Sequence, residues 1–497
     1  MSQARLTSGG HFTTPPPPRS TGLGGRLAEL GFWAVIGLAL AYFIGSADWV
    51  SAALVIGLGA VGVFLVTSPK VIAILWMVGQ PTFFVFPNNV ASGVPFFTLE
   101  RGLFLILLGL MLVRTLTRSG IRRPLNGLEW SILAFVGVLV CSFLTTLPLK
   151  DLKIVRSDIA LLFQCYLMPW LSILIARRMD WTELDVLRFL RLLTVTGIAL
   201  VAIGVLQFFF HVQWFTPRSF EVIHEGRTTG TFGNAVEYGS TLSGLAILTL
   251  AQFTMARDPL LRAVLLACCG AMVGGVIICL TRSPLVGLAA GLLVIYLGDP
   301  RIRSFLAGGA VVGLIGAILI IPLVLDTDAL TARFEEMEPI YNRVALFATA
   351  GQMIGAYPLF GVGFGRYGFS DYKTAYLTGI GEIGAEWAAS IGIPHLEYIH
   401  IAVLTGLVGL GCYILATRAC IRTLRAISAN KQTSPFTRTV AIYVLALLVS
   451  LIVNGLFVDF MAYNYFASLV YFMVGVTSVM RPDLPASRRS GETLPIG

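Results

Sequence analysis

Residues 263–280 read AVLLACCGAMVGGVIICL, a run of apolar and small residues without a single charge. Such a run is long enough to cross a bilayer as a helix, which takes about 20 apolar residues. Only Thr281-Arg282-Ser283 separates it from a second apolar run, residues 284–298. Two runs joined by so short a turn predict a pair of antiparallel membrane helices with Arg282 at the tip.

The same pattern extends over most of the chain. Of its 497 residues, 56% are hydrophobic and only 12% are charged, whereas a soluble domain carries about 25% charged residues. The sequence therefore predicts an all-α polytopic membrane protein with about 12–14 transmembrane helices. The predicted spans are residues 28–45, 50–67, 70–86, 101–114, 127–147, 158–176, 190–210, 234–255, 262–280, 284–298, 304–325, 395–417, 438–458 and 462–480.

The positions of Lys and Arg predict the orientation of these spans. If both termini are cytoplasmic, most of the 35 Lys and Arg residues fall in cytoplasmic segments, as membrane insertion favours. The formal charge of +9 then needs no nucleic acid as a partner. We expect residues 1–26 to be a disordered cytoplasmic tail, residues 27–480 to be the membrane domain and residues 481–497 to be a second cytoplasmic tail.

The only long polar insertion is predicted to be a periplasmic loop, residues 326–394, before the last three helices. Loops of this size are uncommon unless they carry function. Within it, Tyr341 to Ala356 has helical periodicity and few charges, which predicts a helix on the membrane surface. The following Gly361-Val-Gly-Phe-Gly-Arg366 is predicted to be a tight turn that brings backbone close to another element. A nucleotide-binding loop would need a preceding strand.

Four arginines lie on the side that basic residues usually avoid. They are Arg227, Arg282, Arg343 and Arg366. Any one of them could be an interfacial anchor or a surface ion pair. Several on one face, beside the one long loop, favour a binding site for an anion such as a phosphate.

The candidates for acid–base chemistry lie where the twelfth span begins, in Pro394-His395-Leu-Glu397-Tyr398-Ile-His400. A neutral imidazole suits removal of a proton from a hydroxyl, so His395 is a candidate base and Glu397 a reserve. A helix-capping role for His395 is about equally compatible with the residues. Carboxylates are scarce inside the spans, and Asp158 and Glu237 lie near their ends. No spacing typical of metal ligands is present, so we expect neither a metal nor a cofactor.

In order along the chain, these segments resemble the O-antigen ligase and polymerase superfamily of bacterial membrane glycosyltransferases. The resemblance covers residues 227–410, and Leu396 stands where the family often has Asn. The matching segments are Arg227-Thr-Thr-Gly-Thr-Phe-Gly-Asn234, Leu280-Thr-Arg282-Ser283, Arg343 followed by Pro358-Leu-Phe-Gly-Val-Gly-Phe-Gly365, and His395 followed by Tyr398 and Gly406-Leu-Val-Gly409.

The resemblance implies transfer of a glycan from undecaprenyl diphosphate to an acceptor sugar at the periplasmic face of the bacterial inner membrane. Arg227, Arg282, Arg343 and Arg366 would bind the diphosphate, and His395 or Glu397 would act on the acceptor hydroxyl. The acceptor would be another glycan, in a polymerase, or the lipid A core, in a ligase. The number of spans and the divergent loop motif favour a polymerase. Membrane lipid and other polysaccharide export proteins are further expected partners.

Two other classes of protein fit the same sequence. A transporter or flippase of lipid-linked glycan or of a small anion would use the arginines to line a path. The scarcity of carboxylates inside the spans argues against coupling to an ion. A structural scaffold of an export complex would tolerate lysine at the arginine positions, whereas a bidentate phosphate site would not.

Overall fold

A computed structural model describes residues 69–83, 98–116, 125–150, 152–212, 227–309, 338–365, 375–376, 396–459 and 464–481. The regular elements in these ranges are helices, and the only extended pairing among them is an isolated bridge between Thr182 and Arg481. The predicted all-α fold is thus confirmed. The predicted spans 28–45 and 50–67, most of span 304–325 and both tails lie outside the described residues.

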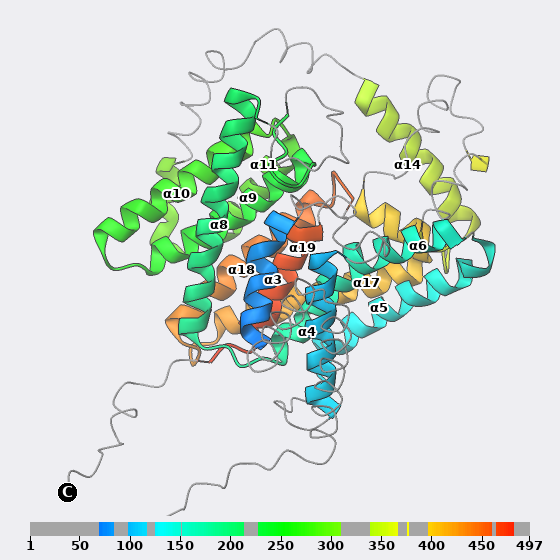
Figure 1. Ribbon diagram of the computed structural model, residues 1–497, viewed down its shortest axis with the longest axis horizontal. Helices are drawn as coiled ribbons and strands as arrows, with labels where there is room; N and C mark the ends of the chain where they lie inside the picture. Colours follow the sequence, from blue (N-terminus) through cyan, green and yellow to red (C-terminus); the bar gives the residue numbers. More distant parts are fainter. Residues whose placement is uncertain are drawn as a thin grey trace, which may run out of the picture. The chain divides into compact units, whose positions relative to one another are not determined.

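The helices follow the predicted spans closely (Figure 1). In chain order they are α3 (Pro69–Phe83), α4 (Leu99–Leu116), α5 (Gly127–Thr146), α6 (Leu152–Leu161), the π-helical turn η2 (Leu162–Leu167), α7 (Met168–Arg177), α8 (Glu183–Phe210), α9 (Ala235–Met255), α10 (Pro259–Ile278), α11 (Arg282–Gly298), α14 (Glu338–Ala356), α17 (Glu397–Ala429), α18 (Pro435–Asn454) and α19 (Asn464–Thr477). The short 3₁₀ helices η1 (Leu147–Leu149) and η3 (Pro300–Ile302) follow α5 and α11.

Six helices among the described residues are long and apolar enough to cross a membrane, which confirms a polytopic membrane protein. A seventh span is added if Arg282–Gly298 and Pro300–Gly309, bent by 109°, are counted as one. The largest difference from the sequence-based prediction is α17, which continues to Ala429 instead of ending at residue 417. Its extension carries arginines, and these mark the end of the apolar stretch but do not interrupt a helix.

Side-chain caps define where several helices begin. Asn126 accepts from the Glu129 N–H at 3.1 Å, and the Glu129 carboxylate accepts in return from the Asn126 N–H, which is a capping box at the start of α5. Thr182 and Asp185 form a second capping box before α8. These caps satisfy backbone N–H groups that a helix leaves without partners.

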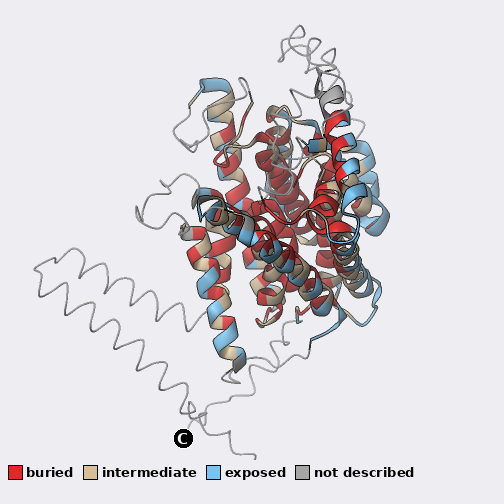
Figure 2. Cartoon of the chain, turned by 90° about the vertical axis from the view of Figure 1, so that its right-hand side faces the viewer, coloured by how far each residue is buried: buried red, intermediate tan, exposed pale blue. Residues whose placement is uncertain are grey.

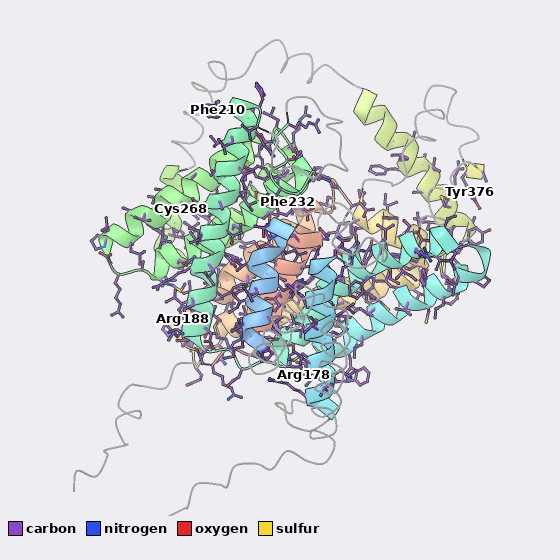
Figure 3. All side chains as sticks on the ribbon, in the orientation of Figure 1. Arg178, Arg188, Phe210, Phe232, Cys268 and Tyr376 are labelled. Atoms are coloured by element: carbon purple, nitrogen blue, oxygen red, sulfur yellow. The ribbon has the colours of Figure 1, made fainter. Side chains whose placement is uncertain are left out.

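Contacts at the two ends of the helices show that they alternate in direction. At the end that carries Arg178 (the Arg178 end), Lys70 of α3 pairs with Asp185 of α8 at 2.6 Å. At the end that carries Phe210 (the Phe210 end), Tyr465 of α19 donates its N–H to Glu237 of α9 at 3.0 Å. Figure 3 shows Arg178 and Arg188 far from Phe210 and Phe232 along the helices.

Among the described helices, α19 is buried along its whole length, from Asn464 to Thr477. Figure 2 shows the buried residues concentrated in the interior of the helix bundle. The helix α19 packs against α7, α18, α9 and α3. Aromatic rings make up much of this core, including Trp170 over Tyr471 with ring centroids 4.2 Å apart. A helix apolar on every side is expected in the centre of a membrane bundle.

The chain divides into two compact units, residues 1–68 with 112–120 and residues 69–111 with 121–497. Within the first unit, the described residues are 112–116, the last turns of α4. All candidate site residues belong to the second unit.

Candidate functional site

Arg227 begins a short segment that is held in front of α9. The Gln207 side chain of α8 accepts from the Gly230 N–H and donates to the Gly230 carbonyl, both at 2.8 Å. Gly230 has a φ of 59° and lies against the Tyr238 ring, so a larger residue would collide there. Asn234 then caps α9 by accepting from the Val236 N–H at 2.8 Å. Arg227 is therefore fixed near the positive end of a helix dipole.

Arg282 is the first residue of α11 and is exposed to solvent. It follows a tight turn in which Leu280 has a φ of 52°, an uncommon conformation for a residue with a side chain. The start of α11 packs directly on α9, where the Ser243 hydroxyl donates to the Pro284 carbonyl at 3.2 Å. Arg282 thus stands at the same end of the helices as Arg227.

Arg227 and Arg282 lie on two segments at the same end of α9. Arg227 is close enough to the turn between α10 and α11 for its charge to act on the Cys279 thiol, three residues before Arg282. Gly239 of α9 lies in contact with Cys279 and Pro284, so α9 and this turn are tightly packed. Arg227, Arg282 and the N-termini of α9 and α11 therefore lie at one end of the helices, which we call the arginine corner. This arrangement favours binding of an anion.

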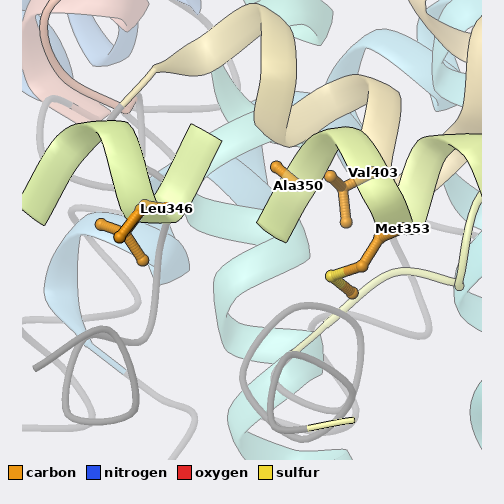
Figure 4. Close-up of a cluster of buried hydrophobic side chains, with 5 residues drawn as sticks. Leu346, Ala350, Met353 and Val403 are labelled. Atoms are coloured by element: carbon orange, nitrogen blue, oxygen red, sulfur yellow. The ribbon is translucent and has the colours of Figure 1, made fainter. Parts of the chain in front are cut away.

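Arg343 lies on a different element from this corner. It belongs to α14, which packs on α17 through the buried cluster of Ala345, Leu346, Ala350, Met353 and Val403 (Figure 4). The helix predicted for Tyr341 to Ala356 is confirmed, although it begins at Glu338. The structure describes the backbone of Arg343 without its side chain, and Arg366 and His395 lie outside the described residues.

The glycine turn after α14 docks into a break in α17. The N–H groups of Val362 and Gly363 donate to the Val403 and Leu404 carbonyls at 2.8 and 3.2 Å. The N–H groups of Leu407 and Val408 donate to the Pro358 and Leu359 carbonyls at 2.8 and 3.3 Å. At the break, Gly406 adopts a φ of 68° and a ψ of −171°.

The predicted close backbone approach of the glycine turn is thus present. Its amides at positions 362 and 363 serve a helix and are not available to cradle a phosphate. The end of the turn is held by α5 and α6. Lys150 donates to the Phe364 carbonyl at 2.8 Å and pairs with Asp158 at 2.8 Å, with both charged side chains fully buried.

Glu397, the reserve candidate for the base, is fully buried at the start of α17. Its N–H donates to the Gly455 carbonyl at 3.0 Å, and its carboxylate lies close to the Tyr166 hydroxyl. The next residue, Tyr398, donates its hydroxyl to the Ile452 carbonyl at 2.8 Å. The first turn of α17 is therefore attached to the end of α18.

A buried pair of a histidine and an aspartate near this turn was missed by sequence reasoning. His400 Nδ1 pairs with the Asp459 carboxylate, and neither side chain is more than 3% exposed. The two residues are far apart in the sequence, and Asp459 lies just beyond a predicted span. A lone aspartate at a span end was the only available signal.

Other polar side chains are also buried at the Phe210 end. Arg101 of α4 donates to Gln164 of η2 at 2.5 Å, and Glu100 is hydrogen-bonded to Gln80. Carboxylates are thus scarce in the middle of the described spans, as predicted, but those described at the Phe210 end are buried and not solvated. They are Glu100, Asp158, Glu237, Glu397 and Asp459.

Comparison with known proteins bears on this arrangement. Residues 267–414 match the family described as O-antigen ligase. The matched segment begins in α10, ends in α17 and includes Arg282, Arg343 and Glu397. Arg227 precedes the matched residues and Asp459 follows them. No curated protein matches the chain.

This match supports the superfamily of ligases and polymerases that the sequence motifs resemble. It also supports a membrane enzyme of glycan assembly, with a lipid-linked glycan as donor and a glycan as acceptor in general terms.

Proposed function

We propose that the protein is a membrane glycosyltransferase that moves a glycan from undecaprenyl diphosphate to an acceptor sugar in the assembly of a surface polysaccharide. The Phe210 end would face the periplasm, and both termini would be cytoplasmic. The observation that carries this proposal is that Arg227 and Arg282 both lie at the arginine corner, beside the first turns of α9 and α11.

The chemistry of the donor explains why such a corner would matter. When the glycosidic bond breaks, negative charge develops on the oxygen of the leaving diphosphate. Two positioned guanidinium groups stabilise that charge, and loss of one well-placed donor of this kind costs about 10²–10³-fold in rate. Arg343 and Arg366, from the segment before α17, are proposed to bind the same diphosphate.

The start of α17 would supply the acid–base group. In the transfer, the acceptor O–H bond breaks, its oxygen bonds to the sugar, and the diphosphate leaves with the electron pair of the broken bond. His395 is proposed to take the proton, with Glu397 as the second candidate. The energy comes from the activated donor, so we expect no metal and no nucleotide to be needed.

We favour a polymerase over a ligase, because the motif after the loop departs from the ligase pattern at Leu396. A polymerase would use a second lipid-linked glycan as the acceptor. A ligase would use the lipid A core. Both enzymes would bind the donor diphosphate at the arginine corner. They would differ in the acceptor that binds beside α17.

Reconstitution tests the proposal. The purified protein is placed in liposomes with a short glycan on undecaprenyl diphosphate and no other acceptor, and the glycan length is followed by gel electrophoresis. We expect a ladder that is lost in the Arg227→Ala and Arg282→Ala variants. The matched control is Arg422→Ala, an exposed arginine near the opposite end of α17, which should retain the ladder.

Other outcomes assign other functions. Transfer only after lipid A core is added would identify a ligase. Movement of the donor across the bilayer, without a new bond to any acceptor from the same cell, would reject the enzyme and favour a flippase. In that case the buried carboxylates at the Phe210 end would be the first residues to test for coupling.

A further inference from the structure

The last turn of α18 contacts the helices that carry the arginine corner. Asn454 is fully buried, and its side chain lies directly against Gly287 of α11, where any side chain would collide with it. The Ser240 hydroxyl of α9 donates to the Asn454 side-chain oxygen at 3.5 Å. Gly287 is five residues after Arg282, just over one helical turn. Asn454 therefore fixes α18 against the beginnings of α9 and α11.

The residues around Asn454 hold the first turn of α17. Gly455 accepts the Glu397 N–H at 3.0 Å, and Ile452 accepts the Tyr398 hydroxyl at 2.8 Å. Asp459 pairs with His400, one turn further along α17. Three consecutive contacts thus connect residues 452–459 to the turn that begins with Glu397.

The segment 452–459 is consequently in contact with both parts of the site. On one side are the helices that begin near Arg227 and Arg282, and on the other is the turn with Glu397. In the transition state of the proposed transfer, the departing phosphate oxygen and the oxygen of the acceptor hydroxyl are both partly bonded to the same sugar carbon. Their separation must be held to a fraction of an ångström, because a shift of about 1 Å can cost roughly 10²-fold in rate.

We propose that Asp459, acting through His400, and Asn454 are positioning residues that set the distance between the arginine corner and the acid–base turn of α17. The inference rests on the proposed function. An aspartate on Nδ1 fixes both the orientation and the tautomer of an imidazole, so the pair holds α17 in one register on α18. Buried polar pairs often contribute little net stability, and geometric specificity is a recognised role for them.

The test separates turnover from donor binding in the reconstituted transfer assay. Asp459→Asn keeps the shape of the side chain and removes its charge. We expect kcat to fall by about 10²-fold, while the KM for the undecaprenyl diphosphate donor stays within about threefold. Asp459→Glu retains the charge and should recover a large part of kcat. Loss of folding alone would lower the amount of active protein without this recovery.

A milder variant keeps the test informative if Asp459→Asn folds poorly. Tyr398→Phe removes the single hydroxyl that bonds to Ile452 and leaves the ring in place. We expect a smaller fall in kcat at an unchanged donor KM. Two matched controls lie at the Arg178 end. Asp299→Asn breaks a buried carboxylate's pair with Arg301, and Tyr443→Phe removes a hydroxyl that lies close to Thr254.

The outcomes distinguish the two proposals. If the wild type transfers glycan and Asp459→Asn and Tyr398→Phe leave kcat unchanged, or lower it no more than their controls, the positioning role is wrong and the enzyme assignment stands. A rise in donor KM that matches the fall in kcat/KM would also overturn it. If the wild type transfers nothing to any acceptor, both proposals fail together.

Discussion

Gly406 of α17 lies directly against the backbone of Leu359, with no room for a side chain between the two segments. Its φ of 68° and ψ of −171° belong to a region that only glycine adopts readily. The glycine therefore allows a membrane helix to break and a preceding turn to fill the break.

We expect Gly406→Ala to lower the free energy of unfolding by about 1–3 kcal/mol, because the backbone conformation is strained for alanine and the new methyl group meets Leu359. Thermal unfolding of the protein in lipid nanodiscs measures the effect. The control is Gly411→Ala on the same helix, where nothing lies within 4 Å of the added carbon. Equal melting temperatures for the two variants would contradict the tight fit.

The buried pair of Lys150 and Asp158 should be far more sensitive than an exposed pair. Lys150→Met leaves the Asp158 carboxylate buried without its cation, which costs about 3–5 kcal/mol. Lys70→Met breaks a pair whose side chains are 33% and 26% exposed, and it should cost less than about 1 kcal/mol. Denaturant titration in mixed micelles compares them. Equal losses would show that the Lys150 pair is solvated.

If the arginine corner binds a phosphate, the planar shape of the guanidinium groups should matter as well as their charge. Arg227→Lys and Arg282→Lys keep the positive charge but lose the planar pair of donors that fits a phosphate. We expect each to lower the transfer rate by at least about tenfold, and alanine to lower it by about 10²–10³-fold. Initial rates in liposomes test this. Full activity of both lysine variants would favour the scaffold interpretation over a phosphate site.

The two candidates for the base can be separated by their effect on turnover. If His395 takes the proton, His395→Ala should lower kcat by about 10²–10⁴-fold, and Glu397→Gln should lower it less. Measurements are made at saturating donor, so that binding does not contribute. The reverse order would assign the base to Glu397, which is buried beside Tyr166.

The helices could be predicted from the sequence because their signals are local. Each described span was found from its apolar run, and α14 from its helical period. The alternation of spans, inferred from Lys and Arg, agrees with the contacts at the Arg178 and Phe210 ends. The predicted close approach of the Gly361 turn followed from its glycines, but its partner, α17, could not be inferred from them.

The site was only partly predictable, since it depends on contacts between distant segments. The motifs pointed to Arg227 and Arg282 as members of one anion site, and the structure brings them to the same corner. Arg343 was grouped with them, yet it belongs to a helix that packs on α17. The position of Asp459 at a span end was a weak signal, but its pairing with His400 could not be inferred, because neither residue reveals its partner by spacing.

The break in α17 also has a consequence for the order in which the protein is made. Residues 358–363 leave the ribosome before residues 403–408, and neither segment can complete its hydrogen bonds without the other. Unpaired peptide groups are costly in lipid. Until the later segment arrives, the peptide groups of the earlier segment therefore need other hydrogen-bond partners, so this part of the fold is completed late in synthesis.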